Sequence, residues 1–119
     1  MESFHPMYLT RDVLQADYEE YTKEGAKGLW HLSLLGPENS TSNFALRAYI
    51  IDSGGHSAPD NHRHEHGVYV LTGILKVKVG EQMLELKQGD VIHIAAYEPH
   101  QFLNPGQQPA KFLCVRDFP

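Results

Sequence analysis

Four side chains able to bind a metal ion recur at every second position of one short segment, residues 60–66 (DNHRHEH). Residues two apart in an extended strand point to the same side, so Asp60, His62, His64 and His66 share one face if the segment is extended. Histidine is the commonest metal ligand in proteins, and the whole chain of 119 residues contains eight. The spacing therefore indicates a candidate site for a divalent metal.

The row continues into Val68 and Val70, which belong to the same side and are expected to face the interior of the fold. Ionisable groups that lead into an apolar interior are costly unless they are paired or bound to a metal. A solvated histidine-rich loop is the alternative, because short histidine tracts are only compositional signals. The residues of this segment alone leave both interpretations open.

A second candidate, His100, follows Glu98-Pro99 and begins an apolar segment that ends at Asn104-Pro105. A lone histidine at the start of a strand is more often structural than a ligand. Its interest lies in pairing with the 60–66 segment, which an antiparallel fold permits despite the separation in sequence.

The elements that must position these residues are β-strands. From Gly28 onward, short apolar runs alternate with turn signals about every 8–12 residues, and no segment has a sustained helical period. The sequence therefore predicts an all-β antiparallel sandwich or barrel over residues 28–119. Residues 1–27 are expected to form an irregular N-terminal arm with one short helical turn over residues 13–21, capped by Thr10. The expected strands are 29–35, 44–51, 68–71, 74–79, 83–86, 91–95, 100–103 and 110–115.

Composition excludes several classes of function. The net charge of −5 gives no basic surface for nucleic acid, and no apolar run approaches the ~20 residues that span a bilayer. The single cysteine cannot form an internal disulfide, and the N-terminus lacks the pattern of a secretory signal, so a cytoplasmic protein is expected. No nucleophilic serine motif, phosphate loop or dinucleotide fingerprint is present.

The segment GDVIHIAAYEPHQFLN resembles the second motif of the cupin family, G-x5-P-x-G-x2-H-x3-N. Gly89, His100 and Asn104 stand at the family's spacing, whereas Ala95 replaces the proline and Tyr97 the glycine. The resemblance covers residues 44–115 and implies an antiparallel double-stranded β-helix, the jelly-roll barrel. Small single-domain cupins with a histidine-rich metal site are the most similar subgroup.

The family's first motif, G-x5-H-x-H-x3-4-E-x6-G, is altered in this chain. His66 stands at the position of the motif's glutamate, and a gapless match places Asp60 and His62 at the two histidines. The resemblance thus implies Asp60, His62, His66 and His100 as metal ligands. A shifted match takes His64 in place of Asp60, and we favour the gapless one.

The implied cofactor is a divalent transition metal (Mn, Fe, Ni, Cu or Zn), because imidazole and carboxylate ligands serve all five. The implied activity is a metal-dependent reaction on a small-molecule substrate, most plausibly by an oxygen-using, dioxygenase-like oxidoreductase. The alternatives are a metal-dependent isomerase or lyase, and a non-catalytic cupin that binds or senses a small ligand. We consider His64 and Glu98 as proton relays and Arg47 as an anchor for a substrate carboxylate. A homodimer is expected, because an open sheet edge favours pairing.

Overall fold

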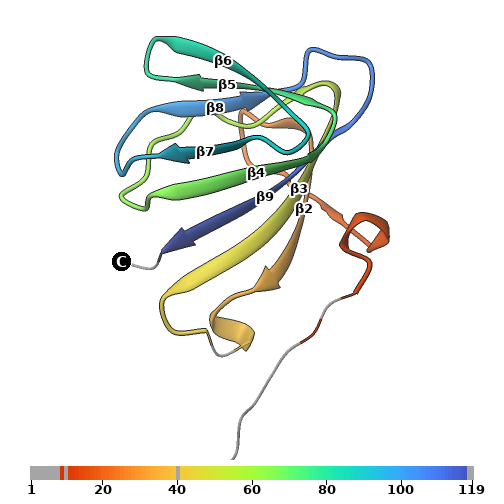
Figure 1. Ribbon diagram of the computed structural model, residues 1–119, viewed down its shortest axis with the longest axis vertical. Helices are drawn as coiled ribbons and strands as arrows, with labels where there is room; N and C mark the ends of the chain where they lie inside the picture. Colours follow the sequence, from red (N-terminus) through yellow and green to blue (C-terminus); the bar gives the residue numbers. More distant parts are fainter. Residues whose placement is uncertain (1–8, 10, 40, 118–119) are drawn as a thin grey trace, which may run out of the picture.

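The computed structural model describes residues 9, 11–39 and 41–117 of the chain. Nine strands in this part form an antiparallel, nearly closed barrel, which confirms the jelly-roll prediction (Figure 1). The strands are β1 (Glu19–Glu20), β2 (Lys27–Leu35), β3 (Phe44–His56), β4 (His66–Thr72), β5 (Ile74–Val79), β6 (Gln82–Lys87), β7 (Val91–Ile94), β8 (His100–Leu103) and β9 (Ala110–Asp117).

The strand order is β6-β5-β8-β3-β9-β4-β7, and β2 and β1 are added through pairing of β2 with β3. β3 is 13 residues long and connects the two halves of the barrel, since it pairs with β2 and β9 and, at His56, with β8. This order brings the start of β4 and the start of β8 to the same open end of the barrel, at the left in Figure 1.

The core is made of residues that alternate along the strands and point inward. Ile51, Val70 and Phe112 are almost completely buried, from three different strands. Each such side chain contributes about 1.5–3 kcal/mol by leaving water. This apolar packing supports the end of the barrel where the histidines lie.

Every strand expected from the sequence is present, with ends that differ by a few residues. The N-terminal arm differs from the expectation. In place of a helical turn over 13–21 it has a single 3-10 turn, Val13–Gln15, followed by β1, which pairs with β2. Asp12 precedes the turn with a left-handed φ of 55° and makes no capping hydrogen bond. Thr10 and residues 1–8 lie outside the described residues.

The sequence has no apolar run long enough to span a bilayer. Among the residues described, no helix is long and apolar enough to cross a membrane.

Candidate metal centre

Three histidines from separate parts of the chain meet inside the open end of the barrel. His62 lies in the β3–β4 connection, His66 is the first residue of β4, and His100 is the first residue of β8. One ring nitrogen from each lies within 4.8 Å of the others. His66 and His100 are only 7% and 8% exposed, so the cluster is sunk into the barrel. Three of the four ligands expected from the sequence are therefore brought together.

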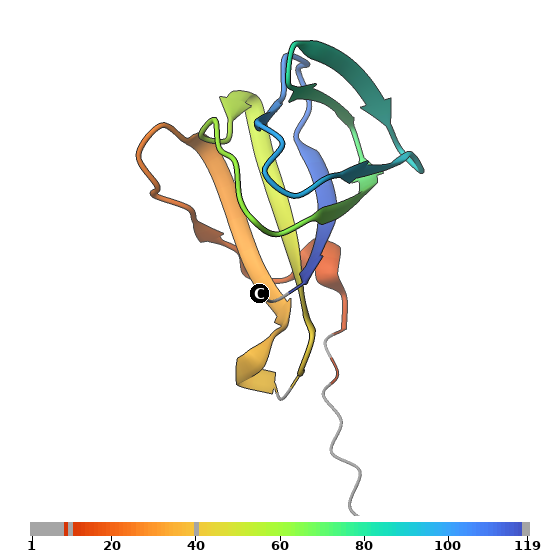
Figure 2. The ribbon, with the colours of Figure 1, turned by 90° about the vertical axis from the view of Figure 1, so that its left-hand side faces the viewer.

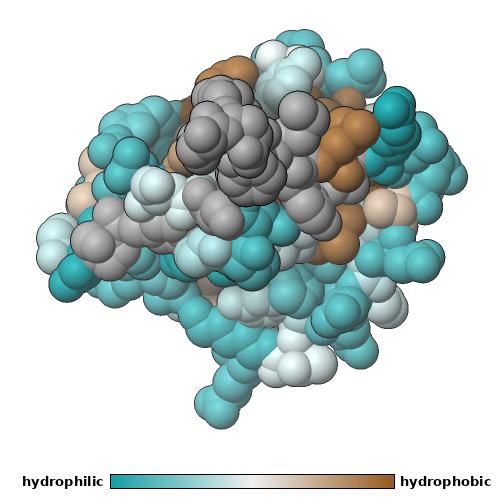
Figure 3. Space-filling view, turned by 90° about the horizontal axis from the view of Figure 1, so that it is seen from below, coloured by the Kyte–Doolittle hydropathy of each residue, from teal (hydrophilic) through white to brown (hydrophobic). Residues whose placement is uncertain are grey.

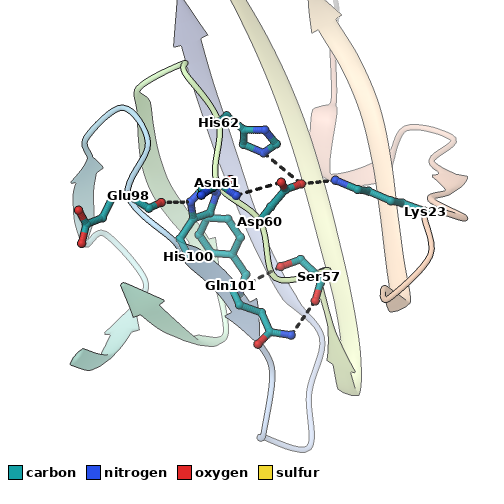
Figure 4. Close-up of polar contacts among 9 residues, drawn as sticks. Lys23, Ser57, Asp60, Asn61, His62, Glu98, His100 and Gln101 are labelled. Carbon is teal, nitrogen blue, oxygen red and sulfur yellow. Dashed lines mark hydrogen bonds and ion pairs between the residues drawn. The ribbon is translucent and has the colours of Figure 1, made fainter. Parts of the chain in front are cut away.

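The backbone holds the β3–β4 connection against β8. Asp60 and His100 exchange two hydrogen bonds, at 2.9 Å from Asp60 N to His100 O and 2.8 Å in the other direction. The N–H of Tyr97 donates to the carbonyl of His62. Ser57 anchors the same connection, because its hydroxyl accepts from the N–H of Phe102 at 2.9 Å (Figure 4). His62 and Asp60 thus have their backbone positions set independently of any metal.

His100 is oriented by its own turn. Its Nδ1 lies 2.9 Å from the carbonyl oxygen of Glu98, as Figure 4 shows. A carbonyl only accepts, so Nδ1 carries the proton and Nε2 keeps its lone pair. Metal-binding histidines are typically fixed in this way through their other nitrogen.

His66 has the strongest local indication of a missing partner. Its Nε2 is buried and has no hydrogen-bond partner among the described residues, while its Nδ1 lies 3.4 Å from Sγ of Cys114. Burial, together with the charges of His100, His62, His64 and Arg116, lowers the pKa of His66 to about 4. The ring is therefore neutral at pH 7, the form that binds a metal.

The carboxylate of Asp60 lies beside His62, outside the group of three mutually close histidine nitrogens, and has several close neighbours. Oδ2 pairs with Nζ of Lys23 and lies 3.3 Å from Nε2 of His62, while Oδ1 accepts from the N–H of Asn61 at 2.9 Å (Figure 4). Partial burial opposes ionisation, but the hydrogen bond with Lys23 and the charges of His62 and Lys23 hold the pKa of Asp60 below its usual value. The role of Asp60 as fourth ligand stays a prediction.

The two proposed proton relays lie at the edge of this cluster. The His64 ring centroid is 6.1 Å from that of His62, and its buried Nδ1 has no partner among the described residues. The carboxylate of Glu98 points away from the histidines in Figure 4, and only its backbone carbonyl contacts His100. The relay roles of both residues, and His64 as alternative ligand, stay predictions.

The cluster opens into a half-open pocket with mainly apolar walls. Figure 2 looks at this end of the barrel, and the β3–β4 connection runs across it in front of β3. The walls include Phe102 and Phe112, while Val68 and Val70 are buried in the core, on the interior side where the sequence places them. The lining residues are Tyr21, Lys23, Leu29, Tyr49, Ser57, Ala58, Asp60, His62, His66, His100, Phe102, Phe112 and Cys114.

Sequence reasoning missed Lys23, Tyr21 and Cys114 as parts of this site. Tyr21 and Lys23 lie between β1 and β2, where the sequence predicted the end of a helical turn at Tyr21 and an irregular arm at Lys23. The contact of these two residues with the cavity depends on how the N-terminal arm folds back on the barrel, and local sequence patterns do not predict that folding. Cys114 could have been found, because its alternation with Phe112 on β9 predicts the interior face.

The comparison with known families agrees with this geometry. Residues 48–116 match the Cupin domain family, and the chain belongs to that family.

Several relatives were found. 1-Methylthio-D-xylulose 5-phosphate methylsulfurylase from Rhodospirillum rubrum is 34% identical over 70 residues, which are 59% of this chain but only 45% of the relative. The chain thus spans less than half of that protein. The uncharacterized protein MJ1618 from Methanocaldococcus jannaschii is 27% identical over 114 residues, 89% of this chain and 87% of that protein.

Solved structures are also similar. The polyketide cyclase RemF from Streptomyces resistomycificus has a TM-score of 0.84 at 26% identity, covering 93% of this chain and 80% of that chain. A predicted oxalate decarboxylase from Thermotoga maritima has a TM-score of 0.81 at 20% identity, covering 93% of this chain and all of that one. The latter likeness concerns the fold alone.

Proposed function

We propose that the protein is a metal-dependent enzyme that acts on a small molecule inside the barrel. The observation that carries this proposal is the meeting of three buried or half-buried histidine nitrogens within 4.8 Å of one another, one of which has no hydrogen-bond partner in the described part of the chain. Imidazole nitrogens gathered at the buried end of an apolar pocket are costly unless they bind a partner. Three imidazoles suit a divalent transition metal, and identity among Mn, Fe, Ni, Cu and Zn is left to experiment.

We assign Asp60 as the fourth ligand. Two ligand atoms bound to one metal at about 2.1 Å are about 3.0–3.4 Å apart, and the Asp60–His62 separation of 3.3 Å falls in that range. The ammonium group of Lys23 pairs with the same oxygen, Oδ2 of Asp60, so a metal would compete with Lys23 for that oxygen.

The chain's own residues then have distinct parts. His66 and His100 offer nitrogens whose rings are fixed by Cys114 and by the Glu98 carbonyl. Phe102 and Phe112 pack with their ring centroids 5.1 Å apart and their planes tilted by 35°, and they form an apolar wall that limits water around a bound substrate. A bound metal would polarise an oxygen atom of the substrate or activate a small oxygen-containing ligand.

Of the reaction classes, we favour an oxygen-using, dioxygenase-like oxidoreductase, because the described site offers metal ligands while burial raises the pKa of its thiol, Cys114, to about 11 and so makes it a poor nucleophile. A lyase, cyclase or isomerase is the second candidate. It is favoured by the relatives, since RemF is described as a cyclase and the Rhodospirillum protein as a methylsulfurylase. Neither name implies consumption of dioxygen.

The experiment is turnover of candidate diol and enolisable substrates by the metal-loaded protein, in an oxygen electrode and in an anaerobic chamber. Dioxygen uptake equal to substrate loss supports the oxidoreductase. Turnover that proceeds at the same rate without dioxygen removes it in favour of the second candidate. Ligand-induced thermal stabilisation without product from any substrate would indicate a non-catalytic binding protein.

A further inference from the structure

Two arginines continue the interior face of the barrel beyond the histidines. β3 and β9 pair without irregularity over residues 44–51 and 110–117, so side chains two apart stay on one face. Tyr49 and Cys114 line the cavity. Arg47, two residues before Tyr49, and Arg116, two residues after Cys114, therefore face the same side as the cavity wall, one step beyond the residues that line it.

The register brings these arginines close together and close to His66. Arg47 is directly opposite Cys114 across β3 and β9, and Arg116 is directly opposite His66 across β9 and β4. Arg47 and Arg116 are thus diagonal neighbours, a separation that long side chains bridge. The positive charges of both act on Cys114, lowering its pKa against the larger effect of burial, which raises that pKa to about 11.

The arginines have few partners: Arg47 lies beside the hydroxyl of Tyr49, which is a neutral group. Nε of Arg116 is buried and has no hydrogen-bond partner, and neither arginine forms an ion pair among the described residues. Glu38 lies near enough for Arg47 to lower its pKa, but its Oε1 accepts from the hydroxyl of Ser33 at 2.6 Å. Half-buried cations without a counter-ion are costly, even though the chain as a whole is acidic.

We propose that Arg47 and Arg116 form a subsite for an oxyanion, a carboxylate or phosphate group carried by the molecule that enters the cavity. Guanidinium groups bind both kinds of oxyanion through paired N–H donors. The subsite lies next to His66, so an anionic group held there would place the rest of the molecule over the histidine cluster. Its assignment to a substrate rests on the proposed function, whereas the binding of an anion does not.

The test uses the full chain freed of metal with a chelator, so that no anion can bind through a metal. Calorimetric titration with inorganic phosphate and, separately, with succinate is carried out at constant ionic strength on the wild type and on Arg47→Gln and Arg116→Gln. Lys111→Gln is the matched control, because Lys111 lies on β9 with its side chain on the opposite face and loses the same charge. We expect saturable binding of at least one probe, weakened about tenfold or more by either arginine substitution and unchanged in the control.

The two probes also identify the anionic group. Binding of phosphate alone would indicate a phosphate group, and binding of succinate alone would indicate a carboxylate. No saturable binding of either probe, or equal affinity in all three variants, would overturn the subsite. If Arg47→Gln does not fold, Arg116→Gln decides the question. Failure of metal binding, measured separately, would remove the metal-dependent function and leave this result unaffected.

Discussion

Asp60 is the proposed metal ligand whose side chain and backbone both make several contacts in the structure. Its carboxylate pairs with Lys23, accepts a hydrogen bond from the N–H of Asn61 and lies 3.3 Å from Nε2 of His62. Its backbone is locked to His100 by two hydrogen bonds. Because the backbone of Asp60 is already fixed beside the histidines, its carboxylate could bind a metal with little further loss of conformational entropy.

Asp60→Asn is expected to weaken metal binding more than His64→Gln does. The aspartate supplies a charged ligand, whereas His64 would act from outside the cluster, where substitutions typically cost about 10–100-fold in metal affinity. Competition with a chromophoric chelator measures both variants against the wild type. Weaker binding by His64→Gln than by Asp60→Asn would mean that His64, not Asp60, completes the site.

The pKa of His66 predicts a stability change on acidification of the metal-free protein. In the unfolded chain histidine titrates near 6.5, and in the fold His66 titrates near 4, so between these values the unfolded state binds more protons. Stability is therefore present above pH 6.5 and is lost as the pH falls toward 4. The expected loss from pH 7 to pH 5 is about 2 kcal/mol. Urea unfolding at the two pH values measures it.

His66→Gln supplies the control for this experiment, since glutamine retains a polar group but does not titrate. Its free energy of unfolding is expected to fall by about 2 kcal/mol less than that of the wild type over the same interval. An equal fall in the two proteins would show that His66 is protonated as easily in the fold as outside it.

At the scale of elements, the loop between β7 and β8 contains a strained residue. Tyr97 adopts a left-handed φ of 65°, at the position where the cupin motif has glycine. Its side chain is 67% exposed, so little packing offsets the strain. The left-handed region costs a residue with Cβ about 1–2 kcal/mol, and glycine avoids this cost. Part of the gain is offset, because glycine has more conformational freedom to lose when the chain folds.

Tyr97→Gly is expected to leave stability unchanged or raise it by up to about 1 kcal/mol. Tyr97→Ala, the matched control, removes the same ring but keeps Cβ, and is expected to be less stable than Tyr97→Gly. Thermal and urea unfolding of the pair measure the difference. A glycine variant less stable than the alanine variant would show that the backbone at Tyr97 is not strained.

The strands could largely be predicted from the sequence, but the contacts between distant parts of the chain could not. Alternation of apolar residues fixes β5 (Ile74–Val79) and β8 (His100–Leu103) to the residue, because one face of each is buried. The two-residue strand β1 and the reach of Lys23 over the cavity carry no such pattern. They result from long-range pairing of β1 with β2, which a local reading of sequence does not contain.

The same distinction applies within the site. Motif spacing predicted that His62, His66 and His100 act together, and the structure confirms their proximity. It did not predict that Lys23 shares the carboxylate of Asp60, or that Arg47 and Arg116 flank Cys114. Arg47 was considered as an anchor, but its neighbour Arg116 becomes visible only through the register of β9 against β3 and β4.

At the scale of the whole molecule, the outer face of β2, β3, β9 and β4 carries several apolar side chains. Trp30 is opposite Ile50 in register, and Leu113 is opposite both Ala48 and Tyr69. Val115 and Tyr69 on this face are 39% and 45% exposed. The lower end of the molecule, by comparison, is mostly hydrophilic with apolar side chains gathered in a few places (Figure 3).

We propose that two copies of the chain pair through this outer face. Val115→Glu is expected to give a monomer, because a buried unpaired carboxylate at the interface is costly. Ile74→Glu is the control, since Ile74 is similarly exposed at 46% but lies on β5, away from this face. Light scattering at micromolar concentration measures both. A monomeric wild type, or a dimeric Val115→Glu, would contradict the proposal.

Metal binding by the histidine cluster is the central claim, and a single measurement tests it. Protein stripped of metal is titrated with Mn²⁺, Fe²⁺ and Zn²⁺ while bound metal is determined by elemental analysis, for the wild type, His100→Ala and His93→Ala. His93 is the control, because its ring is 65% exposed and pairs with Glu65 on the outside of the barrel. The account predicts about one equivalent of metal in the wild type and His93→Ala, and loss of most of it in His100→Ala. A wild type that binds no metal, or a His100→Ala variant that binds it as tightly as His93→Ala, would contradict the account.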